Sequence, residues 1–296
     1  MTKKAAGSNK TSLYIKTFLS ALLPYPSDLL IKESDINKED FRSVFANFDY
    51  QKLEGKRITL RELFVTYSNL AAETVPELIT FILDHFSKTI ISPEKFTMVM
   101  SLFVLTQKGL SESEIIAITK ITHNQWNFII AIFKTFLMKY TSFWKINNEV
   151  FKKGVTTAFL TNPEYKLKLH NAIAEALDKV PNSIRKLEEQ AYHLFCGETY
   201  FKLKEVVSNI ENFLLLFNPN NKYELCRYWQ RLEEKGFDPA FEYNKAVESF
   251  DMHYKPSPED TFRIILQISR FLKEFSDFET RYTPDFRHPY IKYKLS

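Results

Sequence analysis

The stretch from about Leu102 to Leu160 restricts the fold more than any other part of the chain. Its apolar residues recur at helical spacing in three consecutive segments, SLFVLTQKGL, SESEIIAI and HNQWNFIIAIFKTFLM. Gly109 is a typical helix end, and Ser111 with Glu114 three residues later has the pattern of a capping box. Two β-type segments follow, LMKYT and SFWKIN, and then a helical segment, NEVFKKGVTTAFL. The stretch therefore predicts three helices, a small hairpin and a closing helix.

This order of elements predicts a winged-helix domain at residues 102–160. The helix that would read DNA in such a domain spans about residues 124–139, and it needs polar side chains along one exposed face. Its polar residues are Asn124, Gln125, Asn127, Lys134 and Lys139. Because the rest of the helix is apolar on most sides, we expect it to be buried between neighbours rather than presented to a groove.

Further segments flank this domain. Residues 1–12 are basic and small and are expected to be a disordered lead-in, whereas residues 13–101 predict a helical subdomain. Residues 161–276 hold amphipathic helices with short connections, which predict a TPR-like α-solenoid arm of antiparallel helix pairs, without a strict period of about 34 residues. Residues 277–296 are aromatic and basic and predict an extended tail. The predicted fold class is mainly α.

Charge and composition restrict the partners. The 40 basic and 36 acidic residues give a net charge of +4 and are interspersed, so no nucleic-acid footprint stands out. No apolar run approaches the roughly 20 residues of a membrane span, and Lys16 interrupts the first apolar segment, so we expect neither a signal peptide nor membrane insertion. Cys196 and Cys226 fit reduced, buried thiols. The chain is accordingly expected in the cytoplasm.

The motifs of the common catalytic sites are missing from the sequence. The fragment from Gly7 to Thr11 resembles part of a phosphate-binding loop, but it lacks the second glycine and a preceding apolar strand. The six histidines show no metal-ligand spacing, and His193 with Cys196 one turn later fits core positions better than half of a metal site. We therefore predict a non-enzymatic protein with no catalytic residue, metal, cofactor or small-molecule substrate.

Several segments, taken in order, resemble a known family. They are LYIKTFLSALL, VPELITFILDHFSK, FTMVMSLFVLTQKGLSESEII, the pair Gln125-Trp126, SFWKINNEVFKKGV, LKLHNAIAEAL and EQAYHLFCGETYFKLKEVV. Together they resemble the region that follows the P-loop core of STAND (NACHT-type) NTPases, most closely the nephrocystin-3 and telomerase-protein-1-like group. The resemblance covers about residues 13–217.

The resemblance implies lid-like helices at residues 13–101, then a winged helix, then the start of a helical-repeat arm. The sequence departs from the family at Ser12, where a proline is usual, and at Asn147 and Asn148, where Phe-His is common. The P-loop core is not in this chain, so nucleotide hydrolysis is not carried over. The chain is then a truncated product, a segment of a larger chain, or a stand-alone remnant that kept the scaffold.

These patterns favour a scaffold or protein-interaction subunit of a larger intracellular assembly, binding protein partners through the arm and the tail. Analogy with nephrocystin-3-like proteins suggests a ciliary or cytoskeletal assembly. Aromatic side chains are preferred anchors of such contacts, and the candidates are Tyr223, Tyr228, Trp229, Tyr282, Phe286 and Tyr290. Core packing competes with this role at each position, because Phe and Tyr occur throughout the chain. Two alternatives stay open: the regulatory part of a STAND switch whose P-loop core lies elsewhere, and a winged-helix nucleic-acid binder.

Overall fold

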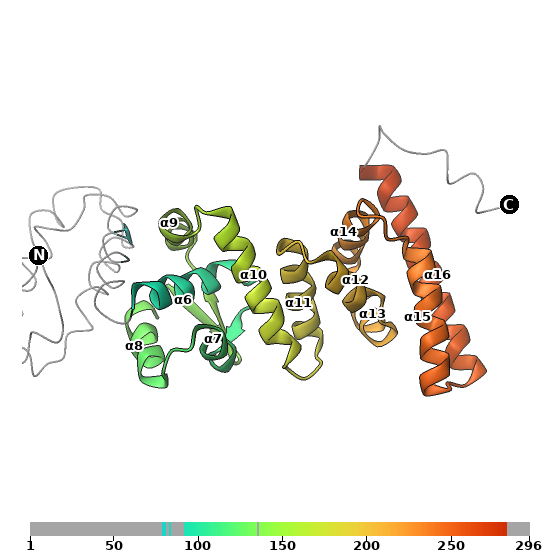
Figure 1. Cartoon of the computed structure of the whole chain (residues 1–296), viewed down its shortest axis with the longest axis horizontal. Coiled ribbons are helices and arrows are strands. Elements are labelled where there is room, and N and C mark those ends of the chain that lie inside the picture. Colours follow the sequence, from blue (N-terminus) through green and yellow to red (C-terminus); the bar gives the residue numbers. More distant parts are fainter. Residues whose placement is uncertain (1–78, 81–82, 84–91, 135, 283–296) are drawn as a thin grey trace, which may run out of the picture. The chain divides into compact units, whose positions relative to one another are not determined.

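The computed structural model describes residues 79–80, 83, 92–134 and 136–282 (Figure 1). These residues are mainly helical, and their strands form one small sheet, which confirms the mainly α fold class. The chain divides into two compact units, Met1–Ala176 and Leu177–Ser296. The predicted lead-in and most of the predicted N-terminal subdomain and tail lie outside the described residues.

The first unit combines helices with the small sheet. Its described elements are α6 (Pro93–Leu105), β1 (Leu110–Ser111), α7 (Glu112–Thr119), α8 (His123–Phe133), β2 (Leu137–Tyr140), β3 (Phe143–Ile146), α9 (Glu149–Phe159) and α10 (Pro163–Asp178), which crosses into the second unit. The sheet is antiparallel with the order β1-β3-β2. Trp144 of the central strand pairs with Leu110 on one side and Lys139 on the other. α6 contacts α7, which follows it closely in the sequence, and also β3 and α9, which come later.

Local capping chemistry fixes where these helices begin. The predicted capping box is confirmed: the Ser111 N–H donates to Glu114 Oε2 at 2.7 Å, and the Glu114 N–H donates to Ser111 Oγ at 3.2 Å. Thr122 and Gln125 form a second box at the start of α8, which the sequence interpretation did not identify. Each box satisfies two backbone N–H groups that a helix start leaves open.

Aromatic side chains fill the core of the first unit. Phe136 stacks on Phe151 of α9 with 4.4 Å between ring centroids, and Phe133 of α8 lies 5.8 Å from the same ring. Trp126 of α8 packs edge-on against Trp144 of β3 at 5.8 Å. Because each buried ring is worth roughly 1.5–3 kcal/mol, these contacts hold α8 and α9 to the sheet.

The second unit is an array of helices. They are α11 (Ile184–Cys196), α12 (Tyr200–Ser208), α13 (Ile210–Leu216), α14 (Lys222–Glu233), α15 (Pro239–Tyr254) and α16 (Pro258–Tyr282). α11 packs on α12 and α15 packs on α16, and each helix from α11 to α14 also contacts the helix two positions later. Stacked helix pairs in a solenoid have this pattern. Helices two positions apart begin at Ile184, Ile210 and Pro239, so each step along the array is shorter than the 34-residue repeat of TPR proteins.

A buried tyrosine joins five helices of this array. Tyr243 of α15 has no exposed surface; its hydroxyl accepts from Trp229 Nε1 of α14 at 3.0 Å and donates to the Val207 carbonyl of α12 at 3.0 Å. Its ring lies 4.8 Å from Phe213 of α13 and 5.7 Å from Phe271 of α16. One side chain therefore supplies both the polar and the aromatic contacts at the centre of the unit.

Removing the Tyr243 hydroxyl tests this role. Tyr243→Phe leaves a buried indole N–H and a buried carbonyl without this partner, and we expect it to lower the free energy of unfolding by about 2–4 kcal/mol. Tyr223, whose side chain is 57% exposed, is the matched control, and Tyr223→Phe should stay within about 0.5 kcal/mol. Urea unfolding followed by circular dichroism measures both, and equal midpoints for the two variants would contradict the assignment.

The same tyrosine predicts an alkaline loss of stability. Burial raises the pKa of Tyr243 well above its ordinary value, and burial also raises the pKa of Tyr228 and of Tyr192. The unfolded chain releases these protons near pH 10, whereas the folded chain keeps them. The folded state therefore binds more protons above about pH 10, and its stability falls as pH rises from there toward the raised pKa values. Unfolding curves between pH 8 and about 11 should show a steeper fall for the unaltered chain than for Tyr243→Phe.

Gly109 and Gly236 have similar backbone geometry but different surroundings. Replacing each of them by alanine therefore distinguishes the cost of steric crowding from the cost of backbone strain. Gly109 has a φ of 92° just before β1, and a Cβ there would lie 3.0 Å from the Phe143 Cβ; Gly236 has a φ of 90° with nothing within 4 Å. We expect Gly236→Ala to lower the free energy of unfolding by about 1 kcal/mol. Gly109→Ala should cost about 2–4 kcal/mol because β3 must also shift. If urea unfolding shows the same decrease in the free energy of unfolding for both variants, β3 can shift without an energetic cost and the prediction is wrong.

Candidate protein-binding site

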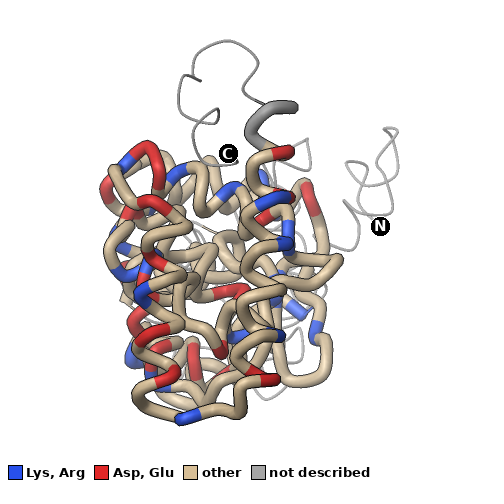
Figure 2. The backbone as a smooth tube through the Cα atoms, turned by 90° about the vertical axis from the view of Figure 1, so that its right-hand side faces the viewer, with Lys and Arg blue, Asp and Glu red and all other residues tan. Residues whose placement is uncertain are grey.

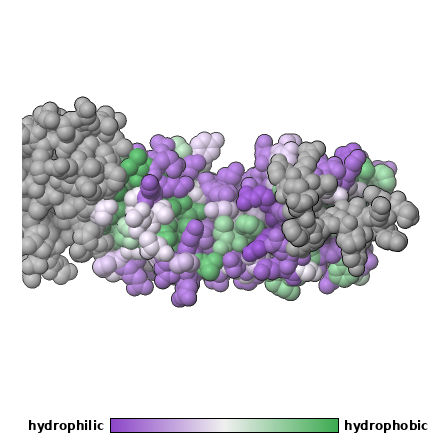
Figure 3. Space-filling model, turned by 90° about the horizontal axis from the view of Figure 1, so that it is seen from above, coloured by the Kyte–Doolittle hydropathy of each residue, from purple (hydrophilic) through white to green (hydrophobic). Residues whose placement is uncertain are grey.

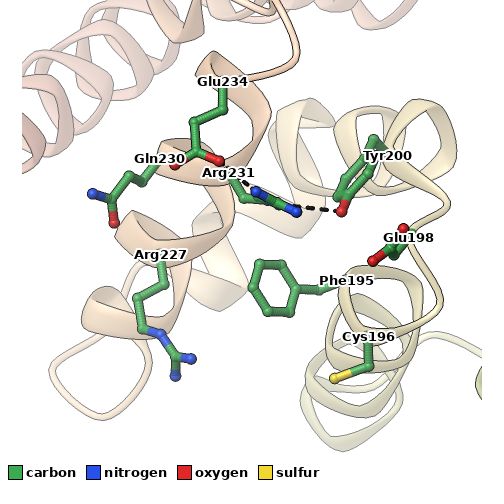
Figure 4. Close-up of a pocket in the computed structure, with 8 residues that line it drawn as sticks. All are labelled: Phe195, Cys196, Glu198, Tyr200, Arg227, Gln230, Arg231 and Glu234. Carbon is green, nitrogen blue, oxygen red and sulfur yellow. Dashed lines mark hydrogen bonds and ion pairs between the residues drawn. The ribbon is translucent and has the colours of Figure 1, made fainter. Parts of the chain in front are cut away.

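A hollow of about 400 Å³ opens in the second unit between the α11–α12 turn and α14 (Figure 4). Gly197 caps α11, and Glu198 follows it with a φ of 55°, a left-handed geometry that turns the chain sharply toward α12. The lining residues are Phe195, Cys196, Glu198, Tyr200, Arg227, Gln230, Arg231 and Glu234. One wall is thus the end of one helix and the start of the next, and the other wall is one face of α14.

Arg231 is held in place on the α14 wall. Its Nε donates to the Tyr200 hydroxyl at 3.1 Å, and its Nη1 donates to Glu234 at 2.6 Å. The guanidinium carbon lies 5.6 Å from the centroid of the Tyr200 ring. The hydrogen bond to Glu234, and then the one to Tyr200, raise the pKa of Arg231 above its ordinary value, so the group is always charged.

Arg227 lies one helical turn before Arg231 and is more open to solvent. Its side chain is 54% exposed, its Nη1 donates to both carboxylate oxygens of Glu224, and its guanidinium lies 5.9 Å from the Phe195 ring. Figure 4 shows the Phe195 ring projecting toward α14 between the two walls. The hollow therefore offers aromatic faces and guanidinium groups side by side, with carboxylates near its rim.

This arrangement offers several groups that can contact a bound molecule. Guanidinium groups over aromatic faces form cation–π contacts and still present donors to a carboxylate or a peptide carbonyl. Among the described residues, no group of three or more His, Cys, Asp or Glu side chains could hold a metal ion. His193, near this hollow in sequence, is fully buried with its Nε2 2.9 Å from Glu189, a core position as expected.

The predicted anchors are distributed differently from expectation. Tyr223 is exposed on α14, four residues before Arg227. Tyr228 and Trp229 are 5% and 0% exposed, so their assignment as exposed anchors is wrong. Tyr228 packs against the Phe195 ring at 5.3 Å, and Trp229 makes the hydrogen bond to the buried tyrosine of α15.

The tail anchors are not tested by this structure. Tyr282 is the last residue of α16, and its side chain, like Phe286 and Tyr290, lies outside the described residues. These three assignments stay predictions.

The sequence interpretation missed the residues that line the hollow. The row Tyr223, Arg227 and Arg231, spaced by four residues, was a readable signal of an aromatic and basic face on α14. Phe195 and Tyr200 come from another helix pair, and no spacing rule links them to that row.

α8, the helix considered for DNA reading, is less enclosed than expected. Trp126, Ile129, Ile132 and Phe133 are buried, but the opposite side is exposed. That side carries His123, Asn124, Asn127, Ala131 and Lys134. The expectation of burial between neighbours is therefore wrong for this side, because the helix packs through one face only. The exposed side of α8 carries Lys134 but not the several Lys and Arg side chains that phosphate binding uses. Figure 2 shows basic and acidic residues interspersed along the described backbone.

In sequence, the chain is similar to a repeat protein. A TPR repeat-containing protein of Dictyostelium discoideum is 24% identical to it over an alignment of length 255, and the alignment covers 78% of this chain and 14% of that protein. The chain thus spans about one seventh of the relative's length. No protein-family model matches the chain, and no solved structure matches it. Within the described residues, none of the helices is long and apolar enough to cross a bilayer.

Proposed function

We propose that the chain is a protein-interaction scaffold and that α11–α16 form its binding arm. The relative's name, TPR repeat-containing protein, supports a helical-repeat role in protein interaction. The packing of each helix on the second one after it supports the same architecture. The observation that carries the proposal is the hollow beside α14, because it gathers Arg and aromatic side chains, the types enriched where binding energy concentrates.

The proposed mode of binding follows from the charges of the hollow. Arg227 and Arg231 each already pair with a glutamate, Glu224 and Glu234. A partner carboxylate must compete with these, so the aromatic faces supply most of the affinity and the arginines supply orientation. The matching partner segment is an extended peptide with a large apolar side chain next to a carboxylate.

We propose a non-enzymatic role in a multi-subunit assembly in the cytoplasm. Presentation of partner segments along an arm needs no reacting group, and the residues of the hollow are arranged for contact. A ciliary or cytoskeletal location stays a prediction that follows from the resemblance. Imaging of the tagged chain in ciliated cells is its direct test.

The first unit supports a second candidate, the regulatory part of a STAND-type switch. The elements from α6 to β3 occur in the order helix, strand, helix, helix, strand, strand, and β1 pairs with β3. This order supports a winged helix in which β2 and β3 form the wing. If the switch proposal holds, the chain should associate with a separate P-loop polypeptide in ATP and release it in ADP. Identical co-sedimentation in both nucleotides would contradict it.

The hollow is tested by affinity purification with quantitative mass spectrometry. The bait is the full chain, and the double variant Arg227→Ala with Arg231→Ala should recover its specific partners at a level about tenfold lower, because the hollow loses its orienting groups. The matched control is Lys153→Ala with Lys245→Ala, which removes two exposed cations from α9 and α15. Equal recovery by both variants would place the binding surface elsewhere.

A further inference from the structure

The outer face of α16 carries an ordered stripe of exposed side chains. The core side of the helix is formed by Ile264, Ile268, Phe271 and Phe275. The opposite side carries Glu259, Phe262, Leu266, Arg270 and Lys273, all exposed. Spacings of three and four residues keep this second set on one face.

This face belongs to the least covered part of the array. Six large exposed apolar side chains lie on its last two helices: Phe241, Met252, Tyr254, Phe262, Ile265 and Leu266. α15 buries only Pro239 and Tyr243 of its described residues. Each helix from α11 to α14 is contacted by the helix two positions later in the sequence. Within the described part of the chain, no helix follows that could cover α15 and α16 in this way. Figure 3 shows separate hydrophobic areas on a mostly hydrophilic surface in the described part of the molecule.

The stripe is complementary to itself. Glu259 lies seven residues before Leu266 and Lys273 seven residues after it. Phe262 lies four residues before Leu266 and Arg270 four residues after it. When two such helices run antiparallel and cross at Leu266, every acidic or aromatic position meets a basic one. The two-fold axis repeats each contact, as in isologous dimers.

We propose that α16 pairs with α16 of a second copy of this chain, antiparallel about Leu266. The two Leu266 side chains meet on the axis, with Ile265 beside them. Phe262 of each copy packs under Arg270 of the other as a cation–π pair, and Glu259 of each copy pairs with Lys273 of the other. A single helix pair of this kind gives a small interface, so a dissociation constant on the order of micromolar is expected.

Charge also argues against the chain's own last residues as the occupant. Residues 283–296, TPDFRHPYIKYKLS, contain Arg287, Lys292 and Lys294 against Asp285. A basic segment would meet Arg270 and Lys273 on this face and be repelled. A second copy supplies acidic and aromatic groups, which these two cations do not contact within the part of the chain that the structure describes.

The test is a charge swap measured on the full chain by sedimentation velocity over a concentration series. The unaltered chain should dimerise reversibly. Glu259→Lys and Lys273→Glu should each weaken dimerisation at least about tenfold, because like charges then face each other twice. The double variant, with both changes in one chain, restores both pairs and should return to the original affinity. Glu248→Lys on α15 is the matched control and should change nothing, since Glu248 is exposed but off the stripe.

A substitution at the centre completes the test. Leu266→Asp should abolish the dimer, and circular dichroism should show an unchanged helix content because Leu266 faces away from the core. A chain that stays monomeric at every concentration overturns the proposal. So does a dimer that is insensitive to these changes, or a double variant that fails to recover. A variant that ends at Tyr282 is measured in the same way. If this variant dimerises and the full chain does not, residues 283–296 occupy the outer face of α16, and self-pairing of the intact protein is overturned.

Discussion

The hydrogen-bond relay from Trp229 through Tyr243 to the Val207 carbonyl is the contact on which the arm depends. It places donors and acceptors from three helices in a buried core, where an unmade hydrogen bond costs more than a made one contributes. It also determines which side chains of α14 line the hollow. Arg227 and Arg231 lie two residues before and after Trp229, so they point to the opposite side of α14. Once the indole is fixed in the core, the arginines are fixed at the hollow.

This dependence explains why the sequence could not assign α14 correctly. KYELCRYWQRLEEKG is clearly amphipathic, and helix formation followed from its periodicity. Its aromatics, however, occupy both sides: Tyr223 is exposed, whereas Tyr228 and Trp229 are buried. A tyrosine or tryptophan fits either environment because each has an apolar body and a polar tip. Only the position of Tyr243, contributed by another helix pair, decides which side is the core.

The first unit divides between predictable and unpredictable features in the same way. Ser111 and Glu114 form a capping box that depends on four consecutive residues, so the sequence contains all the information needed. β1 has only two residues, Leu110 and Ser111, and becomes a strand because β3 passes beside it. Two residues have no periodicity to detect. The hollow is the least predictable feature, because its two walls come from helices that are separate in the sequence. The exposed side of α8 is also unpredictable, because it depends on whether a neighbour covers it, and none of the described residues does.

If both proposals hold, the hollow and the α16 stripe together explain how two sites of modest affinity give tight binding of one partner. Both lie within the second unit but on different helices, so pairing through α16 leaves the α14 wall and Tyr200 open. A dimer then presents two hollows in a fixed relation. Arginines that are already paired with Glu224 and Glu234 make each single hollow a modest binder. A partner that spans both hollows converts its second contact into an intramolecular one, and linked contacts of this kind raise avidity by about 10²–10⁴ when the geometry permits both. Modest individual sites on a self-pairing arm would therefore select partners that are themselves repeated or dimeric, which is the property that an assembly scaffold needs.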